Sequence, residues 1–177
     1  ILHYMANRRR IAPGDLVVMD VGAECSDYAT DVTRTVPANG KFTLRQREIY
    51  EVVLGAQKDA LAAVKPGMKV GGDEGSLYRI AYDYINTHSK DLYGEPLGKY
   101  FTHGLSHHVG LEVHDPGDPG LTLKPGMVIT IEPGVYIPEE NIGVRIEDTI
   151  VVTANGYRNL SGSLPKEPDE IEKLVSK

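Results

Sequence analysis

Residues 13–22 read PGDLVVMDVG, and residues 125–134 read PGMVITIEPG. In both stretches a turn-forming Pro-Gly pair is followed by five mostly apolar residues, an acidic residue and, two positions on, a glycine. A histidine precedes each stretch, His3 before the first and His114 before the second. The chain is therefore predicted to contain two copies of one unit, related by a pseudo-twofold axis. A chance match is the alternative, because Pro-Gly often precedes a strand.

The similarity continues after each stretch, where Asp31-Val32-Thr33 follows the first copy and Glu147-Asp148-Thr149 follows the second. Four acidic residues and one histidine of these segments lie in or beside strongly apolar stretches. They are Asp20, Asp31, His107, Glu132 and Glu147. Unpaired charges in an apolar core are costly, and carboxylates that converge there repel one another unless cations hold them. This set of oxygen ligands with one nitrogen ligand predicts a two-metal hydrolytic site.

The first copy is expected to form a hairpin, with strands over residues 16–23 and 28–36. If its turn centres on Cys25 and Ser26, Asp20 lies directly opposite Asp31, with Cβ atoms roughly 5 Å apart. Like charges in that arrangement are destabilising, and a bridging metal would remove the conflict.

Between the copies the apolar spacing becomes helical. One helix is predicted over residues 44–64 with Thr43 as its N-cap, and a second over residues 73–87. A terminal helix is predicted over residues 168–175. The second copy follows two helices, whereas the first begins almost at Ile1. Residues 1–177 are therefore expected to form one domain that is incomplete at its N-terminus.

The composition excludes several functional classes. The net charge of −6 argues against nucleic acid as a partner. No apolar run approaches membrane-spanning length, so no membrane partner is expected. The only cysteine, Cys25, cannot form an internal disulfide and suits a reducing compartment, so a cytoplasmic location is expected.

Residues 103–114, HGLSHHVGLEVH, hold four of the six histidines. A single histidine here would more often be structural, but the cluster together with four buried acids favours a metal site. Arg145 lies two residues before Glu147 and shares its face if this segment is a strand. An imidazole or a guanidinium is needed to stabilise an oxyanion. The alternative for Arg145 is an ion pair that satisfies a buried carboxylate.

The segments that carry these residues resemble the pita-bread metallopeptidases, which include methionine aminopeptidase, aminopeptidase P and prolidase. They are residues 20–22, 31–35, 103–107, 131–134 and 145–148. The resemblance implies an α+β fold with a curved antiparallel sheet and outer helices. It also implies that Asp31 and Glu147 bridge two divalent ions, that Asp20 completes one ion, and that His107 and Glu132 complete the other. A carboxylate-rich site suits Mn best, with Co and Zn as alternatives.

Residues 1–4, 39–42 and 46–50 resemble the aminopeptidase P branch most closely. This implies a metallo-aminopeptidase that releases the N-terminal residue from peptides with proline at the second position. Glu132 would be the general base, His103, His114 and Arg145 would assist catalysis, and His3, His103 and His114 would bind the peptide. The parent protein is expected to be a homo-oligomer.

Two alternatives stay open. One is an Xaa-Pro dipeptidase (prolidase), which shares the same chemistry. The other is a non-catalytic peptide- or protein-binding module on the same fold, against which the intact ligand set argues. The chain could also hold every ligand and be inactive without an upstream region.

Overall fold

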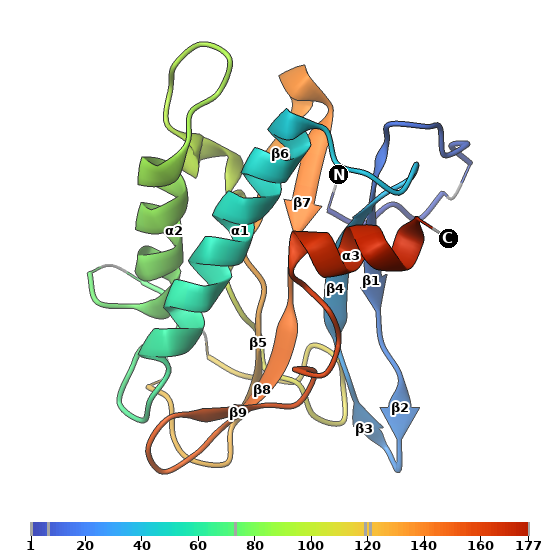
Figure 1. The fold of residues 1–177 in the computed structure, drawn as a ribbon. Coiled ribbons are helices and arrows are strands. Elements are labelled where there is room, and N and C mark those ends of the chain that lie inside the picture. Colours follow the sequence, from blue (N-terminus) through green and yellow to red (C-terminus); the bar gives the residue numbers. More distant parts are fainter. Residues whose placement is uncertain (1, 7, 73, 119, 121, 177) are drawn as a thin grey trace.

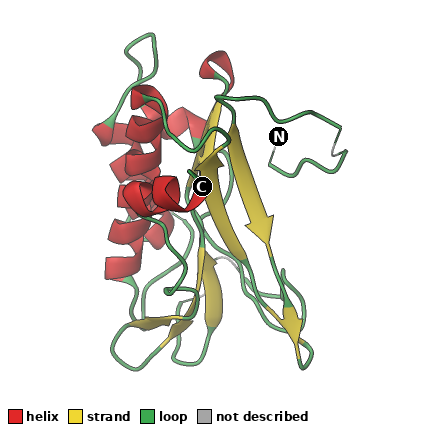
Figure 2. Ribbon diagram, turned by 45° about the vertical axis from the view of Figure 1, so that its right-hand side comes forward, coloured by secondary structure: helices red, strands yellow, loops and turns green. Residues whose placement is uncertain are grey.

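The computed structural model describes residues 2–6, 8–72, 74–118, 120 and 122–176. Over these residues the chain forms an α+β fold in which the two long helices lie together on one side of a layer of antiparallel strands (Figures 1 and 2). The elements are β1 Leu16–Val21, β2 Glu24–Cys25, β3 Tyr28–Ala29, β4 Val32–Pro37, α1 Leu44–Ala63, α2 Leu77–His88, β5 Val128–Ile131, β6 Gly134–Ile137, β7 Ile142–Arg145, β8 Asp148–Val152, β9 Tyr157–Asn159 and α3 Pro168–Val175, with short 3₁₀ helices η1 Leu97–Tyr100 and η2 Pro138–Glu140.

The first copy is the expected hairpin, but its register differs from the prediction. β1 pairs with β4, and β2 pairs with β3 in the same register. The turn residues are Ser26 and Asp27, both with positive φ (53° and 59°), as two-residue hairpin turns of the primed types require. Asp20 therefore lies opposite Thr33, and the prediction that it faces Asp31 is wrong. Asp31 lies two positions along the partner strand, which leaves both carboxylates on one face.

The second copy repeats this hairpin with a break in the middle. β5 pairs with β8 and β6 pairs with β7, and the register is the same on both sides of the break. Glu132 therefore falls opposite Glu147, and Ile146 N donates to Pro133 O at 3.4 Å. The strand ladder thus opens where the two glutamates stand.

The two copies meet along β4 and the segment that joins β7 to β8. Glu147 N donates to Thr33 O at 3.0 Å, and Thr149 Oγ1 donates to Asp31 O at 2.6 Å. Thr33 and Thr149 are equivalent in the repeat, as are Asp31 and Glu147. Equivalent residue pairs are therefore in contact on both sides of the junction, as expected for pseudo-twofold symmetry, although the bonded atoms differ.

The helices begin and end close to their predicted bounds. Thr43 caps α1, accepting from Gln46 N, while the Gln46 side chain accepts from Thr43 N. α2 begins at Leu77 after its N-cap Ser76; its predicted start, Asp73, lies outside the described residues. α3 has its predicted bounds.

The core lies between α1 and the strands of the second copy. Helix residues at three- and four-residue spacing, and strand residues that face them, are fully buried. They include Ile49, Val53, Ala56 and Ala60 from α1 and Ile131, Val144 and Ile150 from the strands. None of the helices in the described part of the chain has the length and apolar character needed to cross a lipid bilayer.

The hydroxyl of Thr35 offers a test of the junction. It donates to Arg145 O at 2.9 Å and accepts from Arg145 N at 3.0 Å, and Thr35 is fully buried. Thr35→Val keeps the shape but leaves both backbone groups without that partner. We expect a loss of about 1–3 kcal/mol in the free energy of unfolding, measured by urea denaturation. Thr102→Val, at an exposed position, is the control; equal effects of both substitutions would contradict this account of the junction.

Candidate metal centre

All nine residues that the sequence selects for the site line one cleft of about 830 Å³. Both copies contribute to its walls, and loops on either side of the strands complete them. The nine are His3, Asp20, Asp31, His103, His107, His114, Glu132, Arg145 and Glu147.

His107 stands at the centre of the carboxylates. Its Nε2 lies 3.4 Å from Asp31 Oδ2, 3.3 Å from Glu132 Oε1 and 4.0 Å from Glu147 Oε1. One ligand atom each from Asp31, His107 and Glu147 lies within 4.8 Å of the others, close enough to share a metal ion. Four of the five predicted ligands therefore converge at one point.

A backbone carbonyl orients the His107 ring. Nδ1 lies 3.0 Å from His108 O, and because a carbonyl only accepts, Nδ1 carries the proton of this bond. Nε2 is then the atom that faces the carboxylates, an arrangement typical of metal-binding histidines. Without metal, burial lowers the pKa of His107, but the bonds to Asp31 and His108 O and the nearby glutamates raise it to about 9.

The two glutamates are held by threonines. Glu147 is only 2% exposed, and its Oε2 accepts from Thr33 Oγ1 at 2.6 Å. Glu132 Oε1 accepts from Thr130 Oγ1 at 3.0 Å. Burial raises the pKa of both carboxyl groups, and their mutual repulsion raises that of Glu147 further.

One oxygen of this pair shows that the residues fit a metal. Glu147 Oε1 is buried and has no hydrogen-bond partner among the described residues. A buried acceptor without a donor costs free energy, and a cation beside it would supply the missing partner. The atoms around it are carboxylate oxygens and an imidazole nitrogen, which are common ligands of divalent metals.

Asp20 lies at the edge of this group, bound to an arginine. It is exposed, so the expectation of four buried acids is wrong for Asp20. Its Oδ2 accepts from Arg145 Nη2 at 2.6 Å and lies 3.9 Å from His3 Nδ1. Arg145 is 3% exposed and also donates from Nη1 to Tyr136 OH at 3.0 Å. The ion pair considered as an alternative for Arg145 is therefore present, on a guanidinium that also lines the cleft.

Three imidazoles surround the carboxylates. His103 Nε2 lies 3.0 Å from Tyr136 OH, and burial lowers its pKa. The His114 ring lies 4.2 Å from the His107 ring, and burial followed by repulsion from His107 lowers its pKa. Both are therefore neutral at pH 7. The His3 side chain is 63% exposed at the rim of the cleft.

Sequence reasoning missed or left open several contacts. Tyr136 is not among the residues selected from the sequence, yet its hydroxyl joins His103 to Arg145. Thr33 and Thr130 were not selected. Each lies two residues from a predicted ligand, which places both side chains on one face of a strand, and this spacing could have revealed them.

Comparison with known proteins identifies the family. The model of metallopeptidase family M24 matches residues 1–154. The Xaa-Pro aminopeptidase of Escherichia coli (strain K12) is 43% identical, covering 99% of this chain and 44% of that protein. Xaa-Pro aminopeptidase 3 of Homo sapiens is 41% identical, covering 99% of this chain and 38% of that protein.

Solved structures agree with the sequence relatives. A Zn-substituted E. coli aminopeptidase P in complex with product has a TM-score of 0.85 at 42% identity, covering 99% of this chain and 44% of that one. Proline aminopeptidase P II from Yersinia pestis has a TM-score of 0.84 at 38% identity, covering 99% and 45%. The chain spans less than half the length of these relatives. Its similarity to these solved structures confirms the predicted pita-bread fold. The chain belongs to metallopeptidase family M24.

Proposed function

We propose that this chain carries the catalytic site of a dinuclear metal-dependent exopeptidase, which releases the N-terminal residue from peptides with proline at the second position. The observation that carries the proposal is the buried Glu147 Oε1, which lacks a donor among the described residues and stands amid carboxylates in an open cleft. The relatives named Xaa-Pro aminopeptidase support the reaction and the substrate class.

In this proposal Asp20, Asp31, His107, Glu132 and Glu147 would hold the two ions. Two divalent ions, Mn in preference to Co or Zn, would lower the pKa of a bound water and polarise the scissile carbonyl. The E. coli aminopeptidase P was solved in a Zn-substituted form, which supports a ligand set that can bind more than one divalent metal.

The chain's own residues supply the proton transfers and the substrate contacts. Glu132 would accept a proton from the water, and its hydrogen bond from Thr130 orients the carboxylate for that role. His103 and His114 would bind the peptide within the cleft, and His3 would contact it at the rim. Arg145 holds Asp20 in place and would add positive charge beside the oxyanion.

An Xaa-Pro dipeptidase would use the same residues, so it is the second candidate. The complete set of ligands in the cleft argues against a binding module without activity. The assignment of residues 1–177 to one incomplete catalytic domain, the homo-oligomeric parent and the cytoplasmic location stay predictions.

Paired substrates test the proposed reaction. With added Mn²⁺, the chain should release the first residue from Xaa-Pro-Yaa peptides faster than it cleaves Xaa-Pro dipeptides, measured by chromatography of free amino acids. Cleavage of dipeptides alone would favour the dipeptidase. Bound metal without cleavage of either substrate would refute peptidase activity for this chain.

Glu132→Gln tests the general base. The amide keeps an oxygen for the metal but cannot accept the proton, so kcat should fall by about 10²-fold or more while circular dichroism stays unchanged. Glu139→Gln, an exposed glutamate on η2, is the matched control and should keep the wild-type rate. A wild-type rate for Glu132→Gln would exclude the general-base role.

Metal binding should depend on pH. His107, with a pKa of about 9, and the two glutamates, with pKa values raised by burial, hold protons near neutral pH that a metal must displace. Mn²⁺ affinity should therefore rise as pH rises toward 9, with proton release detected by calorimetry in buffers of different ionisation enthalpy. All three pKa values are raised in the folded protein, so the folded state holds these protons more tightly than the unfolded chain does. The free energy of unfolding of the metal-free protein should therefore decrease as the pH rises through these pKa values. A pH-independent affinity would contradict these protonation states.

A further inference from the structure

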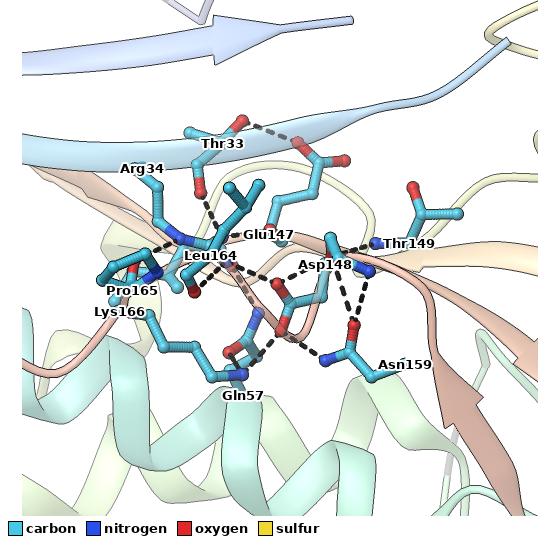
Figure 3. A network of polar contacts seen from close by, with 12 residues as sticks. Thr33, Arg34, Gln57, Glu147, Asp148, Thr149, Asn159, Leu164, Pro165 and Lys166 are labelled. Atoms are coloured by element: carbon cyan, nitrogen blue, oxygen red, sulfur yellow. Dashed lines mark hydrogen bonds and ion pairs between the residues drawn. The ribbon is translucent and has the colours of Figure 1, made fainter. Parts of the chain in front are cut away.

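A buried polar network lies on the opposite side of the strand from the Glu147 carboxylate (Figure 3). It centres on Asp148, which is fully buried and whose side chain points away from that of its neighbour, as strand geometry requires. Its carboxylate accepts hydrogen bonds from four side chains. The donors are Arg34 Nη2 at 2.7 Å, Lys166 Nζ at 2.5 Å, Asn159 Nδ2 at 2.9 Å and Ser161 Oγ at 3.0 Å.

Arg34 connects this network to the backbone of Glu147. Its Nη1 donates to Glu147 O at 2.5 Å and to Thr33 O at 2.9 Å, the same carbonyl that accepts from Glu147 N. The other nitrogens donate to Pro165 O at 2.8 Å and Leu164 O at 3.2 Å. One guanidinium therefore fixes the strand of a proposed metal ligand to the segment that precedes α3.

Lys166 extends the connection to both glutamates. Its Nζ donates to Gln57 Oε1 at 2.9 Å, and Gln57 is fully buried on α1. Gln57 Nε2 donates to Ile131 O at 3.2 Å and to Ile146 O at 3.3 Å. These carbonyls belong to the residues directly before the two glutamates, so the network reaches the backbone on both sides of the break in the strand ladder.

The repeat shows that the fold does not require these charges. The positions equivalent to Asp148 and Arg34 in the other copy are Val32 and Ile150, and Ile150 is fully buried. Buried ion pairs can often be replaced by apolar residues without loss of stability. The charged pair joins the two copies behind Glu147, whereas the symmetry-equivalent positions behind Asp31 are apolar. Because Glu147 carries an oxygen without a partner among the described residues, we infer that this one-sided network fixes the geometry of Glu147.

We propose that the Arg34–Asp148–Lys166 network positions Glu147 for metal binding, which makes residues 161–166 part of the metal centre. This segment lies beyond residues 1–154, which the family model matches. The inference rests on the proposed function only through the assignment of Glu147 as a ligand. The three residues touch no reacting atom; they act through the backbone that carries the ligand.

Mn²⁺ affinity, measured by calorimetry, tests this role without any substrate. Arg34→Lys keeps the charge but loses the paired hydrogen bonds, and Lys166→Met removes the charge at a side chain that is 19% exposed. Both variants should bind Mn²⁺ about 10- to 100-fold more weakly, as expected when partners of a ligand are lost. Lys166→Arg should restore much of the affinity. Lys58→Met is the matched control, because Lys58 forms an exposed ion pair with Glu167. This variant should bind Mn²⁺ with the wild-type affinity.

Amide hydrogen exchange at Glu147 in the metal-free protein gives a second readout. Exchange should be faster in Arg34→Lys and Lys166→Met than in the wild type and in Lys58→Met. If both variants lower the free energy of unfolding but keep the wild-type Mn²⁺ affinity and Glu147 exchange, the network is structural only and the proposal is overturned. If the wild-type chain binds Mn²⁺ but cleaves no Xaa-Pro peptide, the proposed function is refuted. The Mn²⁺ affinities and the Glu147 exchange rates of the variants would still test the role of the network.

Discussion

The repulsion among carboxylates at the junction of the two copies is the constraint on which the structure depends. Asp31, Glu132 and Glu147 approach one imidazole within 4.0 Å, largely out of contact with water. Without metal, burial and mutual repulsion raise the pKa values of Glu132 and Glu147, and one oxygen of Glu147 has no donor among the described residues. The strand ladder, the threonine hydroxyls and the apolar core hold the charges close in spite of this repulsion. Because the carboxylates and the imidazole are already held in place, they would need little rearrangement when a cation binds.

Symmetry provides the frame, and departures from symmetry provide the chemistry. The two hairpins contribute equivalent acids, and equivalent residues, Asp31 with Thr149 and Thr33 with Glu147, are in contact where the hairpins meet. His107 precedes the second copy and has no histidine counterpart in the first, and the buried pair of Arg34 with Asp148 has the apolar counterparts Ile150 and Val32. The duplicated hairpins thus place four carboxylates, while residues without a counterpart surround and orient them.

Much of this arrangement could be predicted from sequence because its determinants are local or repeated. The Pro-Gly openings, the Thr43 cap and the apolar spacing predict the hairpins and the bounds of α1 and α3 closely, whereas α2 begins four residues after its predicted start. The register of the first hairpin could not be read, since it depends on which two residues of Glu24–Asp27 adopt positive φ. Contacts such as Tyr136 with His103, or Arg34 with Pro165, join residues far apart in sequence, and no local pattern marks them.

The bond between Arg34 and Pro165 spans 131 positions in the sequence. A ribosome makes the chain from its N-terminus, so the first hairpin and its two aspartates emerge long before the segment that fixes Glu147. For most of synthesis the nascent chain therefore holds only part of the proposed set of ligands. On this proposal, firm metal binding would wait until the fold is nearly complete, and the geometry of the finished site would decide which ion is bound.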